Sequence, residues 1–235
     1  MNNGTNHLLA ALPRTHHPLL WADLHPVSLL RGEVLFEPGV RPSALVFPTT
    51  AVLSLAMPMR DGACTEFAVV GREGVAGIAL FLGGGTLPYR ATVQSAGLAW
   101  RMPSRSVGTA VAEGSQALAV LLRYIEARMT QTLRLAACQR HHSVVQRLSL
   151  RLMMGLDRAS TDELEMTHEE AAGLLGVRRE GVSVAASRLQ ACGAIRYHRG
   201  HIRVLDRGLL ERHACECHRP VRQDFRRTEP QPLVA

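Results

Sequence analysis

The chain has 235 residues, of which 46% are hydrophobic, so it can bury a sizeable core and an intrinsically disordered protein is excluded. Its formal net charge is +7, and all 27 basic residues are arginines because the sequence contains no lysine. No apolar run approaches the roughly 20 residues that a membrane-spanning helix needs, so we expect no membrane partner.

The N-terminal segment and the cysteines favour a cytoplasmic protein. Residues 1–20 are polar and lack a charged stretch followed by a continuous apolar core, so they predict a loose N-terminal arm and no signal peptide. The five cysteines are odd in number and irregularly spaced. This disfavours a secreted disulfide framework and fits a reducing cytosol.

Residues 21–112 predict an all-β domain. Short runs rich in Val, Leu, Phe and Thr alternate with Gly, Pro and Asp, as in EVLFEPG, ALVFP, AVLSLAMPMRDG, TEFAVVG, ATVQSAG and LAWRMP. Strands at this spacing are typical of a compact β-sandwich or a jelly-roll-like β-roll. Asp61-Gly62 is a strong hairpin signal because both residues tolerate a positive φ. Helices are predicted in the later part of the chain, so the expected fold class is α+β.

Residues 113–139 predict one long helix, because glycines thin out after Pro103 and helix formers dominate. One side of this helix carries a heptad-like apolar stripe of about three heptads. The stripe could pack on the β-domain, but a long helix between two domains with a narrow apolar stripe favours a homodimer interface. The stripe consists of Leu118, Leu122, Ile125, Met129, Thr132 and Ala136.

The next part of the chain predicts a helix-turn-helix. A helical run at residues 143–154 is followed by the polar connector GLDRASTDELE. Thr167 and Glu170 form a capping box, which predicts the start of a helix that ends at Gly176. A second helix is predicted over residues 178–192, with an apolar stripe that faces the first helix. This stripe is Val182, Ala185, Ala186 and Leu189.

After the second helix, two short segments with alternating apolar residues predict a two-stranded wing. They run from Ala194 to Tyr197 and from His201 to Leu205, with a basic tip at Arg199. The helix-turn-helix and the wing together predict one domain over residues 140–220. Residues 221–235 are expected to be a C-terminal tail.

Arg178 and Arg179 stand at the predicted start of the second helix, where a positive charge costs roughly 0.3–1 kcal/mol. An anion held against them would remove this cost, and DNA phosphates and guanine edges provide one. Between Arg178 and Arg212 there are eight arginines and three acidic residues, which favours a polyanionic partner. The alternative is a pair of exposed arginines bridged to Glu169 or Glu170.

The order of a β-roll, a long helix and a winged helix resembles the Crp/Fnr family of bacterial transcription regulators, over about residues 20–220. The most specific part is THEEAAGLLGVRREGVSVAASRLQACGAIRYHRGHIRVLD, whose spacing matches the family's T-x-x-x-[IL]-A-x-x-[LV]-G-x-[ST]-R-E-x-V-x-R region. The resemblance implies a cyclic-nucleotide-binding-like β-roll and a homodimer that binds a palindromic double-stranded DNA operator. It also implies contact with RNA polymerase if the protein is an activator.

The resemblance places candidate DNA contacts on the second helix and the wing. Arg179 and Glu180 fall where the family's groove-reading Arg-Glu pair sits, and Val184 replaces a second base-reading arginine of catabolite activators. Arg178 stands where the family often has Ser or Thr, so the operator sequence should differ from that of catabolite activators. The candidate base contacts are Arg179, Glu180, Ser183, Val184 and Ser187. The candidate phosphate contacts are Arg178, Arg188, Arg199 and His201.

The sensory half departs further from the family. Cyclic-nucleotide binders carry a Gly-Glu pair for the ribose and an Arg-Ser or Arg-Thr pair for the cyclic phosphate. Here the ribose carboxylate position falls at about Ile78, and the phosphate pair falls at Tyr89-Arg90 or Arg90-Ala91. We therefore expect no response to cyclic AMP, and the effector stays open. The resemblance places the effector pocket around Glu73, Gly77, Ile78, Tyr89, Arg90 and Thr92.

The strongest metal-like pattern is Cys215-Glu216-Cys217-His218, close to the C-terminal end. A zinc site usually has a second ligand pair elsewhere, and without one this pattern is weak. We expect this segment to pack beside the wing, with no metal site and no cofactor, and a redox or metal role is the alternative. Cys138 and Cys192 lie in helical patterns and are expected to be small buried residues. His141-His142 is expected to mark a partly exposed helix end.

Two other classes of function compete with DNA binding. An enzyme is not expected, because the sequence has no nucleophile elbow, no paired metal-binding histidines and no dinucleotide fingerprint. The second alternative is a ligand-gated interaction module that uses the basic helix for a protein partner. Salt dependence separates this module from a DNA-binding protein, since DNA binding weakens steeply with salt through counterion release.

Overall fold

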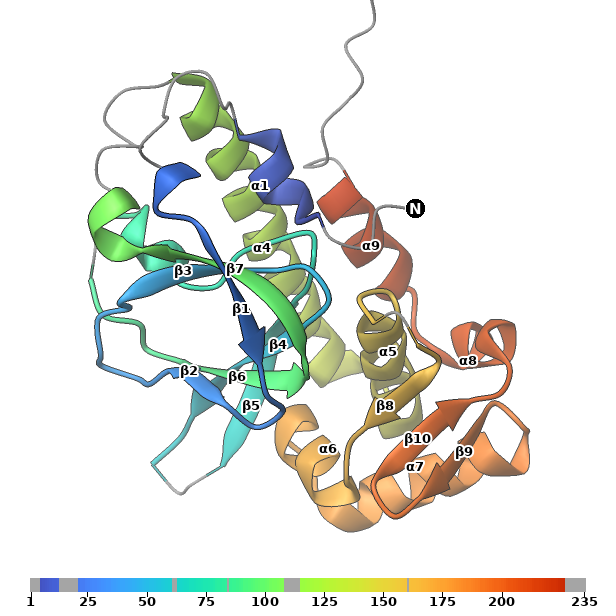
Figure 1. The fold of residues 1–235 in the computed structure, drawn as a ribbon. Helices are drawn as coiled ribbons and strands as arrows, with labels where there is room; N and C mark the ends of the chain where they lie inside the picture. The colour runs from blue at the N-terminus through green and yellow to red at the C-terminus, as the bar shows by residue number, and fades with distance from the viewer. Residues whose placement is uncertain are drawn as a thin grey trace, which may run out of the picture.

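The computed structural model describes residues 5–12, 21–60, 63–83, 85–107, 115–159 and 161–226. The described part of the chain has three regions, which follow one another in the sequence (Figure 1). An N-terminal β-roll packs on one side of a long helix, α4, and a mixed helical and β domain follows beyond the C-terminal end of that helix. The α+β class predicted from the sequence is confirmed.

The β-roll is made of two antiparallel sheets. One sheet has the strand order β1-β7-β3 and the other has the order β2-β6-β4-β5. Their apolar faces enclose a core that includes Leu53, Val70 and Val93. The strands are β1 (His25–Leu29), β2 (Val34–Phe36), β3 (Ala44–Pro48), β4 (Val52–Pro58), β5 (Cys64–Val70), β6 (Arg90–Ser95) and β7 (Gly97–Pro103).

Most strands of the roll lie where the sequence pattern predicts them. β4 and β5 form an antiparallel hairpin, whose expected turn at Asp61-Gly62 lies outside the described residues. β1 was not predicted, because it is short, contains Pro26 and is mostly exposed; it becomes a strand by pairing with β7. Two short 3-10 helices complete the roll, at Ile78–Leu80 and Ser104–Ser106.

The N-terminal segment differs from the loose arm that its polar composition predicts. Residues 7–11 form helix α1 (His7–Ala11), and Leu8, Leu9 and Leu12 are buried in the core shared with α4. Asn6 caps this helix by accepting from the Leu9 N–H at 2.9 Å, and its amide also donates to Pro48 O and Gly74 O at 2.8 Å. Burial of these three leucine side chains therefore orders the segment in spite of its polar composition.

Helix α4 (Ser115–His141) matches the predicted long helix, and residues 113–114 lie outside the described residues. Val120, Tyr124 and Ala127 pack against the roll. The predicted apolar stripe lies on the opposite side and is not covered in the monomer. Leu122 and Met129 are 54% and 61% exposed, and Leu133, which extends the same stripe, is 68% exposed.

The C-terminal region contains the predicted helix-turn-helix and wing, with three further elements. The polar connector contributes β8, which adds a third strand to the wing sheet in the order β8-β10-β9. The elements are α5 (Val144–Leu156), β8 (Glu163–Glu165), α6 (His168–Leu175), α7 (Arg179–Ala191), β9 (Ile195–His198), β10 (His201–Val204), α8 (Arg207–His213) and α9 (His218–Arg226).

The C-terminal end also differs from the expected tail over residues 221–235. Helix α9 crosses the predicted boundary at residue 220, and Val221 is buried against Leu150 and Met154 of α5. The segment therefore packs on α4 and α5 rather than beside the wing. Within the described residues, every helix is too short or too polar to cross a membrane.

Candidate nucleic-acid interface

The start of α6 is fixed by the capping box that the sequence predicts. The Thr167 side-chain oxygen accepts from the Glu170 N–H at 3.1 Å, and the Glu170 carboxylate accepts from the Thr167 N–H at 2.7 Å. Together these bonds satisfy two of the backbone donors that a helix start leaves unpaired. The Glu170 carboxylate thus caps α6 and also lies 2.9 Å from the guanidinium of Arg31.

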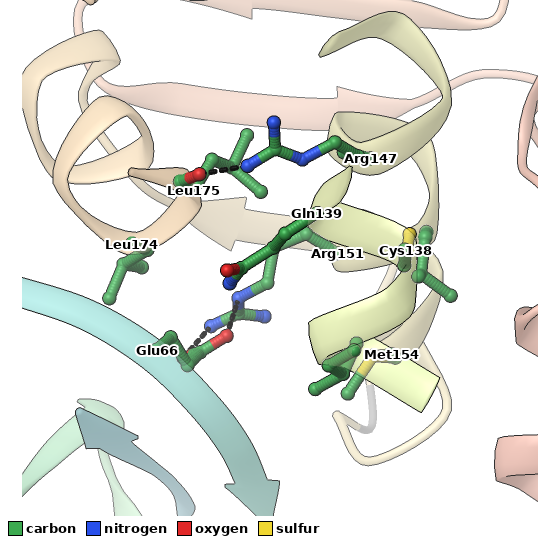
Figure 2. Close-up of a pocket in the computed structure, with 10 residues that line it drawn as sticks. Glu66, Cys138, Gln139, Arg147, Arg151, Met154, Leu174 and Leu175 are labelled. Atoms are coloured by element: carbon green, nitrogen blue, oxygen red, sulfur yellow. Dashed lines mark hydrogen bonds and ion pairs between the residues drawn. The ribbon is translucent and has the colours of Figure 1, made fainter. Parts of the chain in front are cut away.

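The turn between α6 and α7 is held from two sides. Gly176 adopts a left-handed backbone with φ of 61°, which a residue with a side chain adopts only at a cost. Arg147 of α5 donates to the carbonyl oxygen of Leu175, the last residue of α6 (Figure 2). Burial lowers the pKa of Arg147. Sequence reasoning did not identify Arg147, because nothing in its own segment signals this long-range cap.

Helix α7 begins without a side-chain cap, and two arginines stand at this end. Arg178 is the N-cap residue with an extended backbone, and its side chain accepts no cap hydrogen bond. Arg178 and Arg179 are both exposed. No ion pair joins either arginine to a carboxylate within the described part of the chain. The bridge to Glu169 or Glu170 that the sequence left open is therefore not formed there.

One face of α7 is buried and the other is open to solvent, as the apolar stripe predicts. Val182, Ala185 and Leu189 are fully covered by α5 and α6 and by the neighbouring strands. Val184 is 55% exposed and lies on the solvent face. The candidates exposed on this face are Arg179, Glu180, Val184, Ser187 and Arg188.

Ser183 differs from the other candidate base contacts because its hydroxyl already has partners. It donates to the Arg179 carbonyl oxygen at 3.2 Å and is hydrogen-bonded to His168 Nδ1 at 2.9 Å. A base contact by Ser183 would cost these bonds. His168 also stacks on Tyr197 of β9, with ring centroids 4.1 Å apart. Burial, helped by the charge of Arg179, lowers the pKa of His168 and favours its neutral form.

The His168 ring therefore ties three elements together, namely the start of α6, the first turn of α7 and the wing. Sequence reasoning did not single out His168 or Tyr197, and their contact depends on the wing folding back over α6. The arrangement makes α7 and the wing tip one rigid surface. A protein that reads DNA needs such fixed geometry, since base contacts depend on sub-ångström placement.

The wing tip carries Arg199 at the turn between β9 and β10. Arg199 has φ of 47° and Gly200 has φ of 85°, the two positive values that a tight two-residue hairpin turn requires. Arg199 and Arg179 line the same cleft of about 500 Å³, together with His168 and Tyr197. The cleft thus faces two exposed guanidinium groups from different elements. His201 is exposed at the start of β10, on the same hairpin.

The six candidate effector residues have different surroundings in the structure. Glu73 is buried and forms an ion pair with Arg158 at 2.7 Å, so its carboxylate already has a partner. Tyr89 is buried against Phe67 inside the roll. Gly77 precedes the short helix that contains Ile78, and Ile78 packs against the core shared with α4.

Arg90 and Thr92 lie on the outer face of β6, while Ala91 and Val93 point into the roll. Arg90 is paired with Glu37 at 3.0 Å. Both outward residues line a cavity of about 290 Å³ between the roll and the C-terminal region, which Glu165, Glu170 and other residues close from the far side. An anion that met Arg90 would thus lie between the two regions instead of inside the roll.

Comparisons with known proteins agree with this architecture. Residues 146–213 match the family described as the Crp-like helix-turn-helix domain. A protein from Eubacterium rectale assigned to the crp/fnr family of transcriptional regulators is 17% identical, with a TM-score of 0.71, covering 88% of this chain and 96% of its own. No curated protein matches this chain.

Two further solved structures share the fold. A CRP/FNR family transcriptional regulator from Thermus thermophilus has a TM-score of 0.65 and 20% identity, over 81% of this chain and 98% of its own. The regulator CLP from Xanthomonas campestris, described as responsive to c-di-GMP, has a TM-score of 0.62 and 17% identity, over 79% of this chain and 95% of its own. The resemblance to the Crp/Fnr family is therefore confirmed for the fold and for the helix-turn-helix segment.

Proposed function

We propose that this chain is a DNA-binding transcriptional regulator of the Crp/Fnr type that inserts α7 into the major groove. The observation that carries the proposal is the pair of exposed arginines at the uncapped start of α7, of which Arg179 lines one cleft together with Arg199 of the wing. A helix N-terminus already carries partial positive charge, so added cations are unfavourable unless an anion is bound. The phosphates of a DNA backbone supply such anions along a line that is long enough to contact both α7 and the wing.

In this proposal the exposed face of α7 reads bases. Arg179 contacts a guanine, Glu180 accepts from a cytosine amino group, and Val184 touches a thymine methyl group. Ser187 is placed to meet a base edge, whereas Ser183 orients His168. Arg178, Arg188, Arg199 and His201 hold phosphates, which position the protein without specifying sequence.

The test is selection of bound sequences from a random pool of double-stranded DNA, followed by affinity measurements over a range of salt concentrations. The proposal expects a defined consensus and an affinity that falls steeply with salt. A protein-interaction module would select no consensus and would depend only weakly on salt. Recovery of unselected DNA alone would contradict the proposal.

We also infer that the chain acts as a homodimer through α4. Leu118, Leu122 and Met129 form an exposed apolar stripe on a helix whose other side is buried, which a lone soluble chain rarely shows. A second copy of α4 would cover this stripe with coiled-coil packing. Two recognition helices would then meet two half-sites of a palindromic operator about one DNA turn apart.

Two substitutions test the dimer. Leu122→Glu with Ile125→Glu places charges in the stripe and should give monomers by light scattering. The matched control is Ala119→Glu with Arg123→Glu, at exposed positions of the same helix away from the stripe. A dimer mass that survives the first pair, or is lost equally in the control, would show that α4 is not the interface.

Cyclic AMP is not the effector in this proposal. Ile78 stands at the ribose position, Glu73 is paired with Arg158, and Arg90 is paired with Glu37 outside the roll. Calorimetric titration with cyclic AMP should give no stoichiometric binding. Tight binding that strengthens operator affinity would overturn this point while leaving DNA binding untouched. If DNA-bound protein raises transcription, RNA polymerase is the expected partner.

A further inference from the structure

Four potential metal ligands gather where the end of α4 meets the segment between α8 and α9. Cys138 lies in the last turn of α4 and His142 directly follows that helix. Cys215 and Cys217 lie between α8 and α9. One ligand atom of each of the four residues lies within 4.8 Å of the others. This cluster is separate from the exposed face of α7 and from the wing.

Two distances between ligand atoms match those of a tetrahedral zinc site, and all four ligand atoms lie within 4.8 Å of one another. Cys138 Sγ and Cys215 Sγ are 3.5 Å apart, and Cys217 Sγ and His142 Nδ1 are 3.8 Å apart. Zinc bonds of about 2.3 Å to sulfur and about 2.0–2.1 Å to nitrogen, arranged tetrahedrally, separate neighbouring ligand atoms by roughly 3.5–3.8 Å. A disulfide would instead require about 2.05 Å between sulfurs.

The orientation of His142 adds an independent observation. Its Nδ1 atom faces the thiols, while its Nε2 atom lies 3.1 Å from the Glu216 carboxylate. Metal-binding histidines commonly donate their second ring nitrogen to a carboxylate, which fixes the tautomer and orients the lone pair. Glu216 lies between Cys215 and Cys217 in the sequence. One short segment therefore supplies two sulfur ligands and the carboxylate that orients His142.

Two of the four potential ligands are buried in apolar surroundings, and the other two are half-buried. Cys138 and Cys215 are 2% and 5% exposed and pack among apolar side chains of α5, α9 and the roll. Cys138 also lines a small cavity of about 30 Å³ beside Met154 (Figure 2). Four protein ligands leave no open position for a substrate, as is typical of structural zinc.

We propose that Cys138, His142, Cys215 and Cys217 bind one structural zinc ion. The ligands come as a Cys-x3-His pair from the end of α4 and a Cys-x-Cys pair 77 residues after Cys138. The ion would join the proposed dimerisation helix to the C-terminal end of the winged domain. It would thereby restrict how the recognition surface moves relative to α4.

Two histidines near the metal-like pattern, His218 within it and His213 just before it, do not belong to the site. His218 Nε2 is 2.8 Å from the Asp157 carboxylate, so His218 supports the fold at the base of α9. His213 is the last residue of α8 and is not part of the cluster. The second ligand pair that the sequence lacks locally is supplied by α4.

Metal content of the full chain tests the proposal. Protein purified under reducing conditions from zinc-supplied cells should contain about one zinc per chain. Exchange for Co²⁺ should give the intense visible absorption and the thiolate charge-transfer bands of a tetrahedral site. Cys215→Ser and Cys217→Ser should each lower the bound zinc to less than about a tenth per chain. Glu216→Gln should weaken zinc affinity by roughly tenfold in competition with a chelator.

Two further variants keep the test decisive if a ligand change affects folding. Cys192 is an exposed cysteine outside the cluster, so the Cys192→Ser variant should keep the full zinc content. His142→Cys retains four ligands, so it should still bind cobalt with shifted visible bands. The proposal is overturned if the native protein takes up neither zinc nor cobalt. It is equally overturned if mass spectrometry finds a Cys138–Cys215 disulfide in place of a metal, or if Cys192→Ser loses zinc as the cluster variants do.

Discussion

Arginines in two regions of this molecule have opposite environments. On the recognition surface, Arg178, Arg179 and Arg199 are exposed and form no ion pair with a carboxylate of the described chain. Inside the C-terminal region, Arg147, Arg151 and Arg158 are buried and bonded. Arginine thus provides exposed positive charges on the recognition surface, and it provides buried hydrogen-bond donors in the other region.

The buried arginines link the two halves of the chain. Arg151 of α5 forms an ion pair with Glu66 of β5 (Figure 2). It also donates to Gln94 of β6. Arg158, just after α5, pairs with Glu73, which follows β5. A buried charge that loses its partner is strongly destabilising, so these pairs hold the C-terminal region in one position against the roll.

The location of each arginine relative to internal acceptor groups decides its role. The exposed arginines can gain an external partner without losing an internal one. Arg151 and Arg158 cannot leave their carboxylates without a large cost, and Arg147 cannot leave the Leu175 carbonyl oxygen without unpairing a buried group. Variants of the two groups should therefore separate binding from stability.

The largest effect is expected when a buried pair is broken. Arg151→Met leaves the Glu66 carboxylate buried without its cation, and should lower the free energy of unfolding by about 3–5 kcal/mol. Chemical denaturation of purified protein measures this change. The double variant Arg151→Met with Glu66→Gln should recover most of the loss, because no unpaired charge remains. A loss below about 1 kcal/mol in the single variant would mean that water or another group compensates the charge.

A smaller effect, confined to DNA recognition, is expected for Arg179→Ala. Its guanidinium is exposed, so stability should change by no more than about 0.5 kcal/mol. The difference in binding free energy between the preferred base and the other bases at one position of each half-site should fall by roughly 1–3 kcal/mol. Affinities for a panel of operators with single base changes provide the measurement. Uniform weakening for every operator would assign Arg179 to a phosphate instead.

For Arg199→Ala the expected change is in electrostatics alone. Affinity should fall alike for all sequences, and the slope of log affinity against log salt should become shallower by about one. Titrations at several salt concentrations, with wild-type protein as reference, detect this. A sequence-dependent loss would place Arg199 at a base edge.

The smallest expected effect is the pH dependence of the stability that one buried carboxylate contributes. Burial by itself raises the pKa of Glu73, but the charges of Arg158 and Arg128 outweigh it, so the pKa lies below the ordinary value of 4.5. A lowered folded-state pKa gives stability that is present above the unfolded pKa and is lost as pH falls through the folded pKa.

Glu73→Gln removes that titration. The stability difference between wild type and variant should therefore be constant near neutral pH and should shrink as the pH falls below 4.5. The slope cannot exceed one proton, or about 1.4 kcal/mol per pH unit. Denaturation curves at a series of acidic pH values measure it. A difference that grows on acidification would reverse the assigned direction.

Local patterns explain why the recognition half could be predicted. The capping box at Thr167, the turn at Gly176 and the stripe of Val182 and Leu189 each depend on residues a few positions apart. Their geometry is set by the backbone period of a helix and by the steric freedom of glycine, so spacing alone places the elements. The assignment of individual residues to bases and phosphates stays a prediction.

The sensory half was harder to predict because its key contacts join distant segments. Glu73 was a candidate for an effector pocket, yet α5 brings Arg158 against it. The N-terminal arm was expected to be loose, yet Leu8 and Leu9 fill a core formed by β3 and α4. In both cases the partner lies tens of residues away, where no periodicity can indicate it.

By itself, then, the sequence determined the α+β class, the long helix with its apolar stripe, the helix-turn-helix and the arginines at the start of α7. Only the tertiary structure decided which charges have partners and which cysteines meet. The Cys-x-Cys segment is weak as a local motif, and it becomes a four-ligand cluster only because the end of α4 brings Cys138 and His142 beside it. The physical reason is that local backbone geometry is encoded within a few residues, whereas burial and ligand geometry depend on how separate elements pack.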